Sequence, residues 1–267
     1  MTTIQTEIYP SAPLAMVVFE LRIPHTLSLA GRPAQTEVWE ALKQRVPITQ
    51  PEPAVQVTLG APGMMQTQQG PLRMLDRGRT LSVVVGAEVV VVESTGYRCF
   101  EEFREFLASV LTALPSEQIA GFGRIGLRYI NEIRVPGVTL PREWESFIAP
   151  ALLAGTQLAP AGLVAQVGRA EVEYFGENGA RVTMRYGPAS GRLVNAEGPM
   201  RTRTLENGPL FFVDLDSYWE NPPDCDLPEF SSDAILAQTT RLREPIHELF
   251  EAAITGGARD IFRKEPK

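Results

Sequence analysis

The sequence predicts an α+β fold in which a largely antiparallel β-sheet packs against long amphipathic helices. The clearest strand is 124–135, where apolar and polar side chains alternate. A side-chain period of two gives such a strand one face for a core and one for water or a ligand. Apolar residues recur at three-and-four spacing over 97–114 and 235–253, which is typical of helices with one buried side. A chain of 267 residues, 44% of them hydrophobic, can bury a substantial core.

The first elements are a strand, a helix and a long loop. Apolar residues alternate over 16–23, and Pro24 ends that strand. A short helix is expected from about Thr36 to Pro47, because proline cannot continue a helix. The proline-rich segment that follows indicates a loop with one further strand at 55–59.

Two valine-rich strands and a long helix come next. The strands 81–85 and 89–92 are joined by a turn at Gly86, and valines on both faces of each strand predict central positions covered on both sides. The helix over 97–114 is expected to begin at an N-cap on Thr95 and to pack on the sheet.

The middle of the chain predicts a helix over 142–153 and then a β-hairpin. Asn178 and Gly179 supply the turn. A three-residue loop at 177–179, with Gly179 in the left-handed conformation, places Val172 opposite Met184.

The last elements are a strand at 210–219 and the longest helix. Ser231 or Ser232 is the expected N-cap of this helix, and Pro245 is expected to kink it. Its apolar stripe consists of Ile235, Thr239, Leu242, Ile246, Leu249 and Ala253.

The order of the elements suggests two structurally related halves within one domain spanning 1–267. The halves 1–136 and 160–267 each run through strands, a hairpin and a long amphipathic helix, and a proline-rich helical connection joins them. No residue-level repeat accompanies this order, so the duplication is a hypothesis based on element order alone.

Charge and composition limit the classes of function that this protein can have. With 25 basic and 32 acidic residues the net charge is −7, which argues against nucleic acid as a partner. No secretory signal or membrane-spanning run is visible, and the 2 cysteines lack a partner motif. We therefore expect a cytoplasmic protein.

The segment 124–131, Arg-Ile-Gly-Leu-Arg-Tyr-Ile-Asn, resembles the central motif of a sporadically distributed bacterial family of uncharacterised proteins of similar length. Pro13-Leu14, Tyr97, Asp214-Leu-Asp216 and the segment 250–255 match other parts of that family's pattern. The resemblance covers most of the chain and implies a single full-length domain. It also implies a regulatory or defence-related role in accessory bacterial gene sets, but it supplies no activity or catalytic residues.

Asp214 and Asp216 are the main candidate site residues. They lie two apart on a strand and therefore share a face. Two carboxylates so placed can pair with arginines, hold Mg²⁺ or Mn²⁺, or share a proton in acid/base catalysis. Arg124 and Arg128 on the polar face of 124–135 are the natural partners, because a guanidinium fork suits carboxylates. We expect structural pairing, with a ligand or partner site and a catalytic metal site as the alternatives.

Three further features have weaker functional interpretations. Asn131 lies on the otherwise apolar face of its strand and is expected to be a hydrogen-bonded core residue, with a ligand contact as the alternative. His247 has Glu244 and Glu251 beside it on a helix, a grouping that is common by chance. The glycines of 121–126 have the spacing of a dinucleotide loop, but here the strand follows the motif, so we expect a plain loop.

Together these features predict a non-enzymatic binding or regulatory protein that uses Arg124, Arg128, Asn131, Asp214 and Asp216. The expected partner is a protein, a second copy of the chain or a small anionic ligand. Neither cofactor, resident metal, nucleic acid nor membrane is expected. One alternative is a metal-dependent hydrolase or phosphoryl-transfer enzyme built on the two aspartates. The other is a small-molecule carrier of helix-grip type, with an apolar cavity under the last helix.

Overall fold

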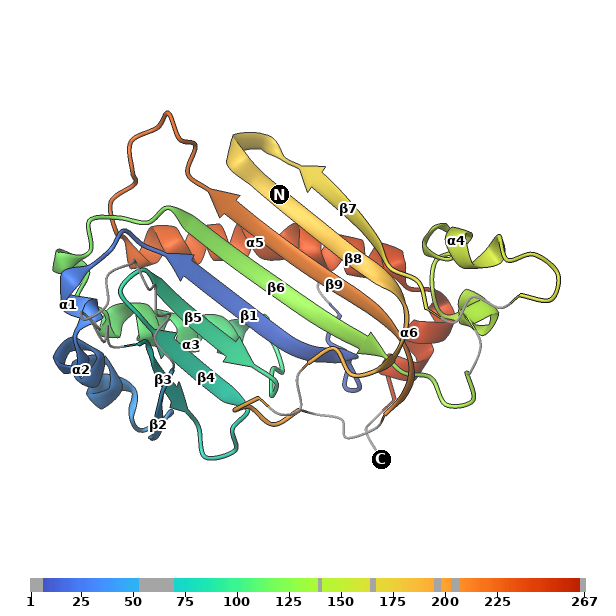
Figure 1. The fold of residues 1–267 in the computed structure, drawn as a ribbon, viewed down its shortest axis with the longest axis horizontal. Coiled ribbons are helices and arrows are strands. Elements are labelled where there is room, and N and C mark those ends of the chain that lie inside the picture. The colour runs from blue at the N-terminus through green and yellow to red at the C-terminus, as the bar shows by residue number, and fades with distance from the viewer. Residues whose placement is uncertain are drawn as a thin grey trace, which may run out of the picture.

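The protein forms one antiparallel sheet with helices packed on one face (Figure 1). The computed structural model describes residues 7–52, 70–138, 141–163, 167–194, 198–202 and 207–264. The strands are β1 (Leu14–Arg22), β2 (Ile48–Pro51), β3 (Leu72–Leu75), β4 (Leu81–Val85), β5 (Val89–Ser94), β6 (Arg124–Ile133), β7 (Ala170–Phe175), β8 (Ala180–Gly191) and β9 (Gly208–Glu220). The helices are α1 (Leu27–Ala30), α2 (Arg32–Leu42), α3 (Phe100–Ala113), α4 (Ala154–Gln157), α5 (Ser232–Ala253) and α6 (Gly256–Phe262).

The strand order is β2-β3-β4-β5-β1-β6-β9-β8-β7, so the first strand of the chain lies beside β6 at the centre. Every neighbouring pair is antiparallel. The prediction of a largely antiparallel sheet in an α+β fold is therefore confirmed.

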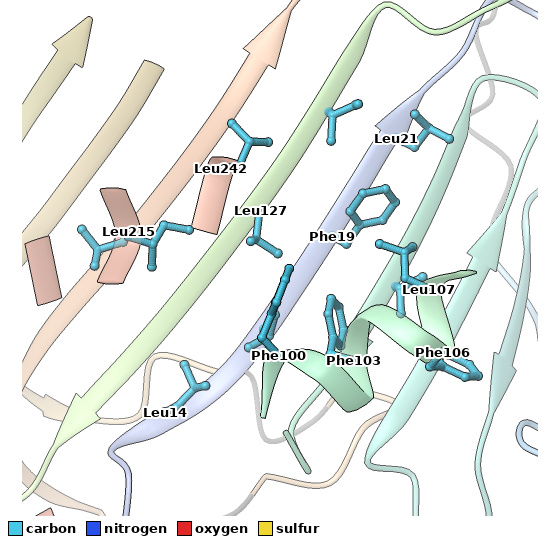
Figure 2. Close-up of a cluster of buried hydrophobic side chains, with 14 of the residues drawn as sticks. Leu14, Phe19, Leu21, Phe100, Phe103, Phe106, Leu107, Leu127, Leu215 and Leu242 are labelled. Carbon is cyan, nitrogen blue, oxygen red and sulfur yellow. The ribbon is translucent and has the colours of Figure 1, made fainter. Parts of the chain in front are cut away.

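The core lies between the sheet and two helices. α5 packs across β9 and β6, and α3 packs against α5 and α2. Figure 2 shows Phe100 and Phe103 of α3 directed toward Phe19 of β1 and Leu127 of β6. All four side chains are buried. The alternation of β1 and β6 directs every second strand residue, including Phe19 and Leu127, toward the helices.

The hairpin register and the start of the last helix agree with the sequence predictions. Val172 lies opposite Met184, and Gly179 has a φ of +81°, the left-handed conformation that glycine adopts without a Cβ clash. The Ser231 hydroxyl accepts a hydrogen bond from the Ala234 N–H at 3.3 Å. α5 continues through Pro245 as one helix.

The prediction of a helix over 142–153 is wrong. The segment forms 3₁₀ turns at Pro141–Ser146 and Pro150–Leu152, followed by the short α4. Pro150 has no N–H to donate to the preceding turn. Trp144 and Ile148 are instead buried, and Ile148 forms an isolated β-bridge with Ile254 after α5.

Two helix starts also differ from expectation. α2 begins at Arg32 rather than Thr36, with Pro33 in its first turn, where proline is favoured. α3 has Cys99 rather than Thr95 as its N-cap, because the Thr95 hydroxyl donates to the Arg201 carbonyl at 2.6 Å.

The valine-rich strands are only partly as predicted. β4 is buried along nearly its whole length, whereas β5 alternates between buried and half-buried residues. The expected strand at 55–59 lies outside the described residues.

Candidate functional site

The face of the sheet opposite α3 and α5 carries the predicted charged residues. Arg128 on β6 donates two hydrogen bonds to Asp214 on β9, from Nε to Oδ1 and from Nη2 to Oδ2, both at 2.7 Å. The residue directly opposite Arg128 is Asp216, so the guanidinium reaches along β9 to the other aspartate. The Asp214 side chain is only 8% exposed and that of Arg128 is 41% exposed. The expected structural pairing is confirmed for these two residues.

Arg124 has different partners from those predicted. Its guanidinium pairs with Glu20 on β1 and lies over the ring of Tyr218, with Cζ 4.5 Å from the ring centroid. Glu20 also accepts from Arg22 at 2.8 Å. Pairing of Arg124 with an aspartate is therefore wrong, because β1 brings a carboxylate that the local sequence did not indicate.

Asp216 lies directly opposite Arg128, but the hydrogen bonds of Arg128 go to Asp214 instead. Burial raises the pKa of the Asp216 carboxyl, and the nearby Asp214 raises it further, while Arg124 and Arg128 oppose the rise. The hydrogen bond to Asp214 raises the pKa of Arg128. Within the described ranges, no group of three or more His, Cys, Asp or Glu side chains is placed to hold a metal ion. The charges of this face thus largely neutralise one another.

Asn131 points to the opposite, helix-covered face. Its side chain donates from Nδ2 to the Val213 carbonyl at 3.0 Å, and the residue is 4% exposed, as expected for a satisfied core amide. It also lines a cavity of about 400 Å³ beneath α5, which we call the α5 cavity. Residues from β6, α5 and the segment before α3 that line it include Tyr97, Tyr129, Asn131, Arg243, His247 and Phe250.

Two buried tyrosines meet in the α5 cavity. The hydroxyls of Tyr97 and Tyr129 are 2.8 Å apart, and their rings pack edge to face with centroids 5.5 Å apart. Burial raises the pKa of Tyr97 to about 12 and that of Tyr129 well above its usual range. Both hydroxyls therefore stay protonated at neutral pH and can donate hydrogen bonds.

Arg243 supplies the positive charge of the α5 cavity. It lowers the pKa of both tyrosines, which places its guanidinium near their hydroxyls, and its Cζ lies 4.9 Å from the Phe100 ring centroid. Among the described residues no carboxylate lies within the 4.0 Å of an ion pair with Arg243.

Two of the acidic residues at the rim of the α5 cavity have partners. Glu251 accepts from the Tyr9 hydroxyl at 3.0 Å and from Arg259 at 2.9 Å. Glu7 accepts two hydrogen bonds from Arg263. Glu101 also lines the cavity, and Arg243 is the cation beside the two tyrosines.

Sequence reasoning singled out Asn131 and, more weakly, His247 and Glu251 among the residues of the α5 cavity. It missed Tyr97, Tyr129 and Arg243 as site residues. A signal was present at Tyr129, which is the second residue with a polar atom on the core face of β6, two positions from Asn131. Arg243 is remote from both in sequence, and only the packing of α5 on β6 brings it near them.

The two tyrosines predict a loss of stability in alkali. Raised pKa values mean that the folded state favours the neutral phenols over the charged phenolates. This stabilisation is fully present below pH 10.0, the usual pKa of tyrosine, and it is lost as the pH rises toward about 12. We expect the free energy of unfolding to fall by about 1 kcal/mol per pH unit above pH 10 for each of these tyrosines, or about 2 kcal/mol per pH unit for the pair. Urea titrations at several alkaline pH values measure this slope.

A Tyr97→Phe/Tyr129→Phe variant is the control for that slope. Tyr9 also has a pKa raised to about 12, by burial and by its bond to Glu251, so the variant should keep only the smaller contribution of Tyr9. An unchanged slope in the variant would contradict the assignment to Tyr97 and Tyr129.

No helix in the described part of the chain is both long and apolar enough to cross a lipid bilayer. Comparison with protein-family models and with curated proteins found no match to this chain. The chemistry of the α5 cavity and of the charged face therefore carries the functional inference.

Proposed function

We propose that the protein is a non-enzymatic binding protein of regulatory type, and that its ligand is a small organic anion held in the α5 cavity. The observation that carries this proposal is the convergence of Arg243 and the Tyr97–Tyr129 hydroxyl pair on one cavity. The site is thus the one under the last helix, on the face of β6 that carries Asn131, rather than the charged face.

The size and lining of the cavity support a small-molecule ligand. A volume of about 400 Å³ falls within the roughly 300–1,000 Å³ of small-molecule sites. Much of the wall is apolar, with Leu14 from β1, Phe100 from α3, and Ile246 and Phe250 from α5. Such a wall favours a ligand with an apolar or aromatic body.

The polar groups support an acidic head group on that ligand. A guanidinium binds a carboxylate through two parallel hydrogen bonds. Tyr97 and Tyr129 together have two hydroxyl hydrogens, and their mutual bond uses one of them, which leaves the second for a ligand acceptor. An aromatic or aliphatic carboxylate satisfies both requirements.

The commitment of Asp214 to Arg128 favours this proposal over a hydrolase or phosphoryl-transfer enzyme built on Asp214 and Asp216. A carboxylate that accepts two hydrogen bonds from one guanidinium and is 8% exposed has little capacity left for a metal ion. The pair contributes instead to holding β6 beside β9.

A thermal-shift screen of small carboxylic acids, each paired with its neutral amide, tests the proposal. We expect at least one acid to raise the melting temperature of the wild type through linkage, while its amide does not. Arg243→Gln should abolish this shift. Arg241→Gln, an exposed site on the same helix outside the cavity, should retain it. An equal shift in Arg243→Gln, or no acid that stabilises the wild type, would overturn the proposal.

We also propose that the two halves are structurally related. The pairing order supports this: β5 pairs with β1 as β9 pairs with β6, and the meander β3-β4-β5 matches β7-β8-β9. Each meander leads into a long helix, α3 or α5. The same pairing favours a division before β6 over the division into 1–136 and 160–267.

A further inference from the structure

One row of directly opposed residues crosses the whole sheet on the face that carries the helices. Phe19 of β1 and Leu127 of β6 are its central pair. The arm toward β3 runs through Val92, Val83 and Met74. The arm toward β7 runs through Ser217, Val182 and Tyr174. If the halves are related, Met74 and Tyr174 occupy equivalent positions, and so do Leu72 and Val172, two residues earlier on each strand.

The two arms differ in what covers them. α2 packs against β3, and Leu72 and Met74 are 5% and 0% exposed. Val172 and Tyr174 on β7 are 36% and 40% exposed. The described residues of the connection from β6 to β7 supply no equivalent cover, since α4 packs against the 3₁₀ turns of the same connection and lies beyond the end of the sheet (Figure 1).

Beside the exposed side chains of β7 lies a groove of about 650 Å³ between α5 and the β7–β8 hairpin, which we call the hairpin groove. Its floor and walls include Tyr174, Val182, Ser217, Trp219, Ala237 and Leu242. The Ser217 hydroxyl is buried, and within the described structure it has no hydrogen-bond partner. Native proteins rarely leave such a group unpaired, so the hairpin groove has the character of an incomplete packing site.

We propose that the hairpin groove is the docking site for an amphipathic helix of a partner protein, which covers the β7–β8 hairpin as α2 covers β3. The inference rests on the proposed relation between the halves. The apolar floor suits a helix with anchors at i, i+3, i+4 and i+7. The charged residues that line the groove are Arg181, Arg241 and Glu177. Their net charge is positive, so acidic residues should flank those anchors.

Peptide display tests the proposal without knowledge of the partner. A library of helix-forming peptides is selected on the wild type and counter-selected on Ala237→Arg, in which a long charged side chain fills the groove from an exposed helix position. We expect the enriched peptides to have the helical anchor spacing and acidic flanks. They should bind Ala237→Arg at least about tenfold more weakly than the wild type.

Ala252→Arg is the matched control, since Ala252 is exposed on α5 and lies outside the groove. Three outcomes would overturn the proposal. The selected peptides could bind all three proteins equally, they could all be extended or proline-rich, or the selection could enrich no peptide. A wild-type dimer that Ala237→Arg dissociates would also overturn it, because a second copy would then be the occupant. The carboxylate response of Ala237→Arg should remain that of the wild type, so failure here is distinguishable from failure of the α5 cavity. Equal losses of stability on truncating Met74 and Tyr174 would mean that β7 is already covered, and that result would overturn the proposal as well.

Discussion

Replacing Met74 by Ala is expected to lower the free energy of unfolding by about 3 kcal/mol, since truncating a fully buried methionine removes its transfer free energy and leaves a cavity. Met74 is 0% exposed beneath α2. The equivalent change at Tyr174, which is 40% exposed, should cost less than about 1 kcal/mol. Urea denaturation followed by circular dichroism measures both values.

The difference between these two variants tests the asymmetry of the sheet. Both residues lie in the same row and face the helices, but β3 pairs with β2 and β4, whereas β7 is an edge strand that pairs with β8. A loss at Tyr174 as large as that at Met74 would mean that β7 is covered in solution, and it would remove the basis for a vacant hairpin groove. A Tyr174→Phe variant separates the effect of the hydroxyl from that of the ring.

Replacing Arg128 by Met is expected to lower the free energy of unfolding by about 2 kcal/mol. It leaves the Asp214 carboxylate buried without its bidentate partner, a change that costs roughly 3–5 kcal/mol for a fully buried pair. The effect is smaller here because the Arg128 side chain is 41% exposed and because Arg185 Nη1 lies 3.9 Å from Asp214 Oδ2. Chemical denaturation at neutral pH measures the loss.

A double variant identifies the cause of that loss. Arg128→Met/Asp214→Leu removes the orphaned carboxylate together with its partner, and it should recover most of the stability, because replacing a whole buried pair by apolar groups is often neutral. Asp216→Asn should have a smaller effect, since the two hydrogen bonds of the Arg128 guanidinium go to Asp214. If the double variant is no more stable than Arg128→Met, loss of packing rather than an unpaired charge explains the effect.

Local patterns in the sequence were sufficient where one segment makes its own structure. The hairpin register follows from the alternation of 170–186 and from Gly179, whose φ of +81° suits glycine. The cap at Ser231 is likewise a bond between residues three apart. Such features depend on neighbours in the chain, so a pattern argument reaches them.

Expectations failed where distant segments compete for the same residues. Thr95 is a good N-cap by residue type, but its hydroxyl bonds to Arg201. The segment 142–153 has helical spacing, yet Trp144 packs against Phe211, with ring centroids 5.8 Å apart, and Pro150 interrupts the helix. Tertiary contacts outweigh a local preference of about 1 kcal/mol.

By itself the sequence predicted the α+β class, the two faces of β6, the pairing of arginines of β6 with aspartates of β9, and the burial of Asn131. Only the tertiary structure decided that Arg128 takes Asp214 while Arg124 pairs with Glu20, that Arg243 joins two buried tyrosines in the α5 cavity, and that no helix in the described part of the chain covers β7. The physical reason is the distance along the sequence between the residues that interact. Side-chain alternation is a property of one strand, whereas an ion pair across β1, a cavity under α5 and an uncovered row each depend on segments that only the folded sheet brings together.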